Sequence, residues 1–229
     1  MAWLLAVAME SEARLFIPRL KPVPAVGCKP CFRGRLAGRE VYLLLTGLGP
    51  VNAAQAVAAA AESLPGVEAV LNLGCAGAYA GSGLKVGETA LATEAVLADT
   101  GVLTQRGWHP LEKLGLPLLR DGQGRDYYHR WPCDPGLNAL LVGAALGLRQ
   151  GVFATVNQVS GDVATAAGME DRWDALLEDM ESAAVAQVAA LYGLPIACLR
   201  GVSNIAGQRE LDVAAGAGAA QEVLLALGN

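Results

Sequence analysis

The chain has 229 residues, a formal net charge of −5 and 53% hydrophobic residues. This length fits one α/β domain over residues 1–229, and the apolar fraction is sufficient for a large core. The negative charge argues against a nucleic-acid-binding protein, and no apolar stretch of the sequence reaches the roughly 20 residues of a membrane helix.

The chain begins with an apolar run that has no basic residues before it and that continues into Glu10 and Glu12. A secretory signal peptide would have a basic start and a small-residue cleavage site, so this run predicts a first strand instead. We therefore expect a cytoplasmic protein without nucleic-acid or membrane partners.

Apolar runs and turn residues predict alternating strands and helices along the chain. In the first half we expect a strand over 3–8, a short helix or turn over 11–20 and a hairpin over 31–37 and 40–46. These are followed by an alanine-rich helix over 51–64, a strand over 68–73, a glycine-rich loop over 74–83 and a strand over 88–97. The second half predicts helices over 136–146, 173–177, 180–191 and 211–227, and strands over 152–156 and 195–202. Residues 106–135 show no periodicity.

This alternation predicts a three-layer α/β fold, with a mixed central sheet flanked by helices. Ligands of such folds bind beyond the carboxyl ends of the strands. The segments that follow the predicted strands are therefore the candidate site, namely 9–12, 47–49, 74–77, 160–162 and 203–204.

Two sequence patterns suggest a bound metal or cofactor only weakly. Cys28 and Cys31 form a single C-x-x-C pair without a second pair, so neither zinc nor another metal is predicted. The loop Gly47–Pro50 lies between a predicted strand and a predicted helix, as a dinucleotide-binding loop would. It lacks the third glycine of that motif. A protein that binds NAD(P) stays an alternative, but we expect no cofactor.

Several segments in order resemble the superfamily of purine nucleoside phosphorylases and nucleosidases, above all its hydrolytic nucleosidases. They are AVAMESEARL, TGLGPVNAA, LNLGCAGAY with LKVGE, VSGD, DMESAAVAQVA and LPIACLRGVSN. The resemblance covers nearly the whole chain except residues 106–135. It implies a nucleoside-phosphorylase-like fold and cleavage of a ribosyl N-glycosidic bond.

The resemblance also implies roles for particular residues. Glu12 matches the carboxylate that orients the attacking water, a suitable task for a general base. Glu181 matches the carboxylate that accepts the ribose hydroxyls, and Met180 lies against the sugar. Cys75 stands where many nucleosidases have serine, and we expect it to pack and not to act as a nucleophile. The other expected substrate-binding residues are Met9, Ala76, Gly77 and Ser203.

Nucleosidases that act on adenine compounds resemble this sequence around Asn204, but they have an aspartate at that position. An amide donates with its nitrogen and accepts with its oxygen. It can therefore donate to a 6-oxo group and accept from N7–H of a purine. An ionised carboxylate facing O6 would leave acceptors unpaired, at a cost of about 1–3 kcal/mol. We therefore expect a 6-oxopurine, hypoxanthine-like leaving group, with Asn204 as a catalytic residue.

Other features leave alternatives open. Phosphorylases place glycine and arginines at the first strand end, where this chain has Glu10 and Glu12, whose charges would repel phosphate. Water is therefore the expected nucleophile, with an adenosine-type nucleosidase or a phosphorylase as alternatives.

Where nucleosidases carry an aromatic residue that stacks on the base, this chain has residues 163–165, Val-Ala-Thr. The candidates for stacking are Trp108, Tyr128 and Trp131.

The part of the substrate remote from the purine has no matching motif. Cations in the unmatched segment or just after Asn204 are candidates for binding it, namely Arg106, His109, Lys113, Arg120 and Arg209. The family resemblance implies a homodimer or a higher homo-oligomer.

Overall fold

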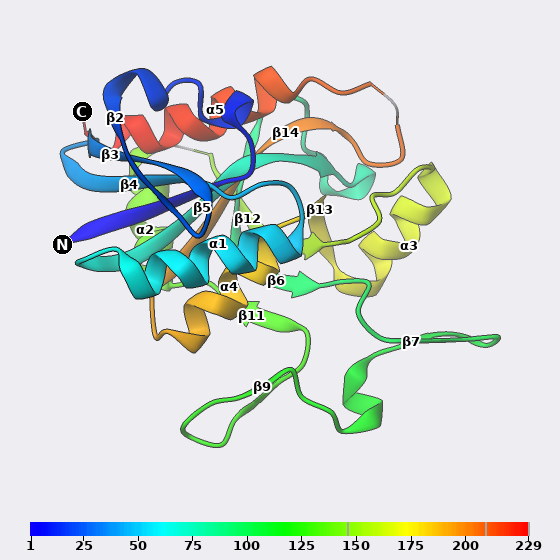
Figure 1. The fold of residues 1–229 in the computed structure, drawn as a ribbon. Coiled ribbons are helices and arrows are strands. Elements are labelled where there is room, and N and C mark those ends of the chain that lie inside the picture. Colours follow the sequence, from blue (N-terminus) through cyan, green and yellow to red (C-terminus); the bar gives the residue numbers. More distant parts are fainter. Residues whose placement is uncertain (146, 209, 229) are drawn as a thin grey trace.

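The computed structural model describes residues 1–145, 147–208 and 210–228. A ten-stranded mixed sheet forms its centre, and helices lie on both of its faces (Figure 1). The strand order is β11-β6-β12-β13-β5-β1-β4-β3-β2, and β14 pairs with both β5 and β6. The three-layer α/β fold predicted from the sequence is thereby confirmed.

The strands of the large sheet are β1 (Ala2–Val7), β2 (Leu20–Val26), β3 (Lys29–Leu36), β4 (Arg39–Leu45), β5 (Val67–Ala78), β6 (Thr89–Leu97), β11 (Arg130–Pro132), β12 (Arg149–Thr155), β13 (Ala175–Asp179) and β14 (Ile196–Ile205). The α-helices are α1 (Pro50–Ser63), α2 (Pro135–Ala144), α3 (Val163–Trp173), α4 (Ser182–Leu191) and α5 (Val213–Ala226). Short 3₁₀ turns are η1 (Glu10–Ala13), η2 (Ile17–Arg19), η3 (Ala80–Ser82) and η4 (Leu111–Leu114).

The sheet separates two apolar layers. On one face, side chains of β1, β4, β5 and β14 pack with α1 and α4, in a cluster that includes Leu4, Val57 and Val185. On the other face, the alternate side chains of the same strands pack with η1, α2 and α5, in a cluster that includes Leu5 and Leu224. Because both faces are covered, the central strands are apolar throughout, as buried parallel strands are.

Two predictions for the middle of the chain were wrong. The helix expected over residues 173–177 is replaced by the strand β13, and α3, which was not predicted, comes before it. The N-cap of α3 is Asp162, whose Oδ1 accepts from Thr165 N at 2.8 Å. The helix has only two fully buried residues, Ala166 and Trp173, so it lacks the apolar stripe that would reveal it.

Two strands extend further than the sequence indicates. The segment 74–78, expected to be a loop, continues β5, because its small residues allow β14 and β13 to pair on either side of it. Ser203 and Asn204 lie inside β14, not in a turn after it. Around residues 11–20 the structure has two 3₁₀ turns and then β2. Leu146, the predicted end of the helix over 136–146, lies outside the described residues.

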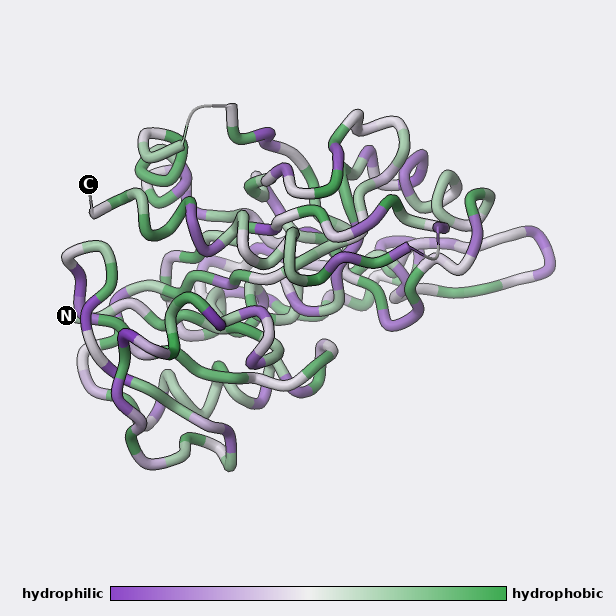
Figure 2. Tube along the Cα trace, turned by 90° about the horizontal axis from the view of Figure 1, so that it is seen from above, coloured by the Kyte–Doolittle hydropathy of each residue, from purple (hydrophilic) through white to green (hydrophobic). Residues whose placement is uncertain are grey.

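Residues 102–129 form an arm that leaves the main body after β6 and returns to it at β11 (Figure 1). The arm contains two small hairpins, β7 (Val102–Thr104) with β8 (Gly107–His109), and β9 (Leu119–Arg120) with β10 (Asp126–Tyr127). The β7–β8 hairpin extends away from the rest of the chain in both views (Figures 1 and 2). Most of the arm is exposed, which explains why its sequence shows no periodicity.

Within the described ranges, no helix combines the length and the apolar character needed to cross a lipid bilayer.

The closest approach of helix to sheet predicts a sensitive position. A Cβ at Gly201 in β14 would lie 1.8 Å from the backbone oxygen of Gly216 in α5. Gly201→Ala should therefore lower the free energy of unfolding by about 3 kcal/mol, because backbone must move. Gly168→Ala is the matched control, since Gly168 lies in α3 with nothing within 4 Å of its Cβ position. In the control variant Gly168→Ala, the free energy of unfolding should rise by up to about 1 kcal/mol, because alanine favours a helix more than glycine does. Urea unfolding measures both, and equal stability of the two variants would contradict the prediction.

Candidate active site

The carboxyl ends of β1, β5 and β14 lie side by side because the three strands are parallel neighbours in the sheet. This arrangement brings together Glu12, Cys75, Ser203 and Asn204, which are far apart in the sequence. The end of β13 and the start of α4 add Met180 and Glu181 from the other side. The segments singled out by the sequence therefore meet at one edge of the sheet.

Glu12 lies in η1 and turns back towards β5. Its Oε1 accepts from the backbone N–H of Cys75 at 2.8 Å, and its Oε2 accepts from Met9 N at 3.2 Å. The side chain is buried. A Cβ at Gly74 would lie 2.8 Å from Glu12 Oε1, so glycine is needed there for the carboxylate to reach β5. These two backbone donors fix the position of a buried carboxylate that has further acceptor capacity.

Glu181 is the N-cap residue of α4, and not a residue of its first turn as the sequence suggested. Its Oε1 accepts from Gly49 N at 2.9 Å, and its Oε2 lies 3.6 Å from Nη2 of Arg200. Burial and the nearby charge of Asp179 outweigh Arg200 and raise the pKa of Glu181 to about 7. A carboxylate of this kind is ready to accept strong hydrogen bonds from a bound ligand.

Arg200 is a buried cation beneath Glu181. Its Nε lies 3.2 Å from Asp179 Oδ2, and its Nη2 donates to Asn72 Oδ1 at 2.5 Å. Asp179 in turn accepts from the backbone N–H groups of Glu181 and Ser182. The guanidinium therefore positions the turn that carries Glu181.

Cys75 lies between Glu12 and Ser203. Burial and the charge of Glu12 raise the pKa of its thiol to about 12. The thiol is therefore neutral at ordinary pH, which agrees with the expectation that it is not a nucleophile.

Asn204 is half-buried at the end of β14, and its amide leans over Gly77 of the neighbouring strand. A Cβ at Gly77 would lie 3.2 Å from Asn204 Nδ2. Ser203 Oγ lies 2.9 Å from Asn204 Oδ1 and 3.1 Å from the backbone oxygen of Ala76. The hydroxyl has a single hydrogen, so it donates a hydrogen bond to one of these two oxygens. Asn204 Nδ2 donates to Ile205 O at a long 3.3 Å. The amide thus keeps donor and acceptor capacity for a ligand.

Two of the three aromatic candidates for stacking on a base, Trp131 and Trp108, are packed against other aromatic side chains. Trp131 is fully buried in the core and stacks on Tyr127, with ring centroids 5.4 Å apart. Trp108 packs against Trp173 and His129. Trp131 is therefore a core residue, and Trp108 helps to hold the arm on α3.

Three candidate cations of the arm, His109, Lys113 and Arg120, already have partners. Arg120 forms a bidentate pair with Asp126 at 2.5 and 2.8 Å, and Lys113 Nζ lies 3.1 Å from His109 Nδ1. Arg209 lies outside the described residues. The sequence missed Lys29, whose Nζ donates to Asn52 Oδ1 at 2.7 Å and would lie 3.2 Å from a Cβ at Gly47. Lys29 thus lies beside the loop that contacts Glu181.

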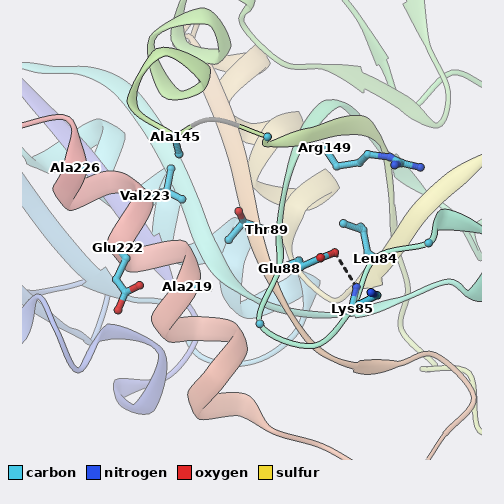
Figure 3. Close-up of a pocket in the computed structure, with 13 residues that line it drawn as sticks. Leu84, Lys85, Glu88, Thr89, Ala145, Arg149, Ala219, Glu222, Val223 and Ala226 are labelled. Atoms are coloured by element: carbon cyan, nitrogen blue, oxygen red, sulfur yellow. Dashed lines mark hydrogen bonds between the residues drawn. The ribbon is translucent and has the colours of Figure 1, made fainter.

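A cavity of about 730 Å³ lies between α5 and the amino ends of β6 and β12 (Figure 3). It is lined by residues such as Lys85, Glu88, Arg149 and Glu222, and none of the predicted site residues lines it.

All five cysteines are free. Within the described part of the chain, no cluster of His, Cys, Asp and Glu is arranged to hold a metal ion.

Comparisons with known proteins agree with this geometry. The phosphorylase superfamily matches residues 4–227. The chain is 42% identical to the futalosine hydrolase of Thermus thermophilus, over 91% of this chain and 85% of that protein. It is 31% identical to a 5′-methylthioadenosine/S-adenosylhomocysteine nucleosidase of Bacillus thuringiensis, over 88% of this chain and 84% of that protein.

Two solved structures show the same fold. The nucleosidase of the same name from Neisseria meningitidis, in complex with methylthio-immucillin-A, has a TM-score of 0.83 and 24% identity, over 99% of this chain and 97% of that chain. A futalosine hydrolase mutant of Helicobacter pylori has a TM-score of 0.81 and 22% identity, over 99% of this chain and 98% of that chain.

The raised pKa of Glu181 predicts how stability depends on pH. The folded chain holds this proton more tightly than the unfolded chain, so stability from this group is lost as pH rises from about 4.5 to about 7. The loss should not exceed about 3 kcal/mol. The glutamine of Glu181→Gln cannot ionise, so this variant should lose less stability than the unaltered protein as pH rises. Urea unfolding at pH 5 and pH 8 compares the two proteins, and an equal or larger loss in the variant would contradict the assignment.

Proposed function

The chain belongs to the phosphorylase superfamily, and from this premise we propose that it hydrolyses the N-glycosidic bond of futalosine. The products are hypoxanthine and dehypoxanthine futalosine, so the reaction belongs to menaquinone biosynthesis. The observation that carries the proposal is the amide of Asn204, which leans over Gly77 at the strand edge where Glu12 and Glu181 meet. The similarity to the futalosine hydrolase of Thermus thermophilus supports it.

In this reaction a water molecule attacks C1′ of the ribose while the bond from C1′ to N9 of the purine breaks. Glu12 is the group that orients the water and accepts its proton, since its carboxylate is held by two backbone donors and keeps acceptor capacity. The new bond joins the water oxygen to C1′, and the electron pair of the broken bond leaves with hypoxanthine.

Glu181 holds the sugar. Its ionised carboxylate accepts hydrogen bonds from the ribose hydroxyls and fixes C1′ near the water. Arg200 and Gly49 keep this carboxylate in place. Met180 precedes it and is half-buried at the turn between β13 and α4, where it can lie against the sugar.

Asn204 reads the leaving base. Its nitrogen donates to O6 of hypoxanthine. As the base departs with the electron pair of the broken bond, N7 takes a proton from solvent water, and the oxygen of Asn204 accepts a hydrogen bond from this N7–H. Ser203 and Ala76 hold this amide beside Gly77. An amide transfers no proton itself, so its contribution is to pair with both polar atoms of the departing 6-oxopurine.

Other reactions of the superfamily fit less well. Glu10 and Glu12 lie where a phosphorylase would bind an anion, and their charges oppose phosphate. A nucleosidase acting on adenine compounds is the second candidate, favoured by the 31% identity to the Bacillus nucleosidase. The Gly47–Pro50 loop gives its Gly49 N–H to Glu181. A dinucleotide phosphate bound there would face a carboxylate, which argues against an NAD(P)-binding protein.

Futalosine carries a benzoate far from the purine, and a cation should meet it. Lys29 is the best-placed cation on the described surface, because its ammonium lies beside the loop that contacts Glu181 and bonds only to the neutral Asn52. Arg120 of the arm is less suited, since Asp126 neutralises it.

The oligomeric state and the location are further parts of the proposal. The arm exposes apolar side chains, namely Leu103, Leu114, Leu116 and Leu118. Exposed apolar side chains of this kind support a homodimer or a higher homo-oligomer. The five free cysteines support a reducing, cytoplasmic location.

A panel of nucleosides tests the proposal directly. We expect rapid release of hypoxanthine from futalosine, slower release of base from inosine and methylthioadenosine, and no requirement for phosphate. The released base is measured by chromatography with and without phosphate. Glu12→Gln is the control and should lose about 10²–10⁴ in turnover, because general-base help is removed. Preferred release of adenine, or a strict need for phosphate, would refute the proposal.

Exchanging the amide for an acid tests the base preference. Asn204→Asp should impair hydrolysis of futalosine and partly rescue cleavage of aminofutalosine, whose 6-amino group needs an acceptor. Mispairing one buried group costs about 1–3 kcal/mol, so the ratio of kcat/KM for the two substrates should move about 10-fold or more towards aminofutalosine. Parallel loss on both substrates with an unchanged ratio would show that Asn204 does not contact the base.

A further inference from the structure

Glu178 is a buried carboxylate on β13 to which the reaction described above gives no role. It is 5% exposed. Its Oε1 accepts from Ser160 N at 2.9 Å, and its Oε2 accepts from Ser160 Oγ at 2.6 Å and Tyr79 OH at 3.3 Å. Among the described residues no cation forms an ion pair with it. A carboxylate has about four acceptor sites, so three donors leave room for one more.

The sheet register places Glu178 in one row with Asn204. Gly77 of β5 pairs with Asn204 of β14 on one side and with Glu178 of β13 on the other. Neighbouring strands are about 4.8 Å apart, so the Cα atoms of Glu178 and Asn204 are separated by about 9–10 Å. Paired residues have side chains on the same face of a sheet. Tyr79, two residues after Gly77, shares that face and reaches Glu178.

Gly77 leaves the space between these two side chains without a side chain of its own. The Asn204 amide already leans from β14 into this space. A flat ring bound against Gly77 would thus have the amide of Asn204 at one edge and the carboxylate of Glu178 near another. Both groups are held by neighbours, Asn204 by Ser203 and Glu178 by Ser160.

The two kinds of purine differ at the position next to the 6-substituent. N1 of a 6-oxopurine carries a hydrogen and is a donor, whereas N1 of a 6-aminopurine is an acceptor. A buried carboxylate can accept a hydrogen bond from the N1–H of a 6-oxopurine. Against a 6-aminopurine the carboxylate and N1 are two acceptors that face each other, which costs about 1–3 kcal/mol.

We propose that Glu178 is a second specificity-determining residue of this site, and that its carboxylate accepts the N1–H of the 6-oxopurine while Asn204 pairs with O6 and N7–H. The inference rests on the proposed function. It gives Glu178 no part in bond breaking. Asn204 and Glu178 together then pair with three polar atoms of the base, N1, O6 and N7, and an adenine ring would mismatch at the first two, N1 and the 6-substituent.

Glu178→Gln provides the test, because its amide can donate to N1 of adenine. Measured as kcat/KM, the preference for futalosine over aminofutalosine should fall about 10-fold or more. Ser160→Ala is the matched control, since it removes a donor to Glu178 but keeps the carboxylate, and it should change both substrates by the same factor. Equal losses in Glu178→Gln, or the same change of preference in Ser160→Ala, would show that Glu178 only holds the Ser160 segment.

A measurement on the unaltered protein decides the question if Glu178→Gln does not fold. Hypoxanthine and 1-methylhypoxanthine are compared as inhibitors, with either futalosine or another cleaved nucleoside as substrate. The methylated base lacks N1–H and should bind at least about 10-fold more weakly. Equal inhibition would overturn the role of Glu178. Failure of the proposed function is distinct, because it appears as absence of hypoxanthine release from futalosine by the unaltered protein.

Discussion

The buried guanidinium of Arg200 is the interaction on which the site depends. It is 1% exposed and lies between Asp179 and Glu181, with Asn72 of β5 as a further partner. A buried cation without partners would be strongly unfavourable. The four residues come from β14, β13, β5 and the start of α4, so their pairing fixes these elements relative to one another at the carboxyl edge of the sheet.

The same charges determine the properties of Glu181. One cation faces two acids, and so the cluster has one negative charge too many for a buried place. Burial, together with the charge of Asp179, outweighs Arg200 and raises the pKa of Glu181, so this carboxylate is in need of donors. Ribose hydroxyls, which we propose that this carboxylate binds, are such donors.

The sequence revealed those parts of the fold and the site whose signals are local. The apolar runs of β1, β4 and β14 and the alanine-rich α1 are continuous in the chain, and the expected ends of these elements are close to those observed. The segments around Glu12, Glu181 and Asn204 were found through their resemblance to known proteins. Their convergence follows from the parallel pairing of β1, β5 and β14.

The missed features depend on contacts between distant residues. Glu178 and Asp179 are acids in a buried strand, whereas the sequence predicted helices on either side of them, over 173–177 and 180–191. The donors that make their burial possible lie in other segments, at Ser160 and Arg200. Likewise, Asp162 and Thr165 form a recognisable N-cap pair, but α3 has too few buried residues to show a helical stripe. Lys29 gains its place near Glu181 only through the position of the Gly47–Gly49 loop.

A change of substrate within one fold requires few residues when the sheet register is kept. Glycine at position 77 leaves space between two neighbouring strands, and the residues paired with it on either side face whatever binds there. Because parallel and antiparallel partners of one residue share its face, an acid or an amide at either paired position changes the polar pattern without moving the backbone. The carboxylates that we propose hold the ribose and orient the water come from other elements, Glu181 at the start of α4 and Glu12 in η1. Under this proposal, residues at the positions paired with Gly77 can change the base preference without moving either carboxylate.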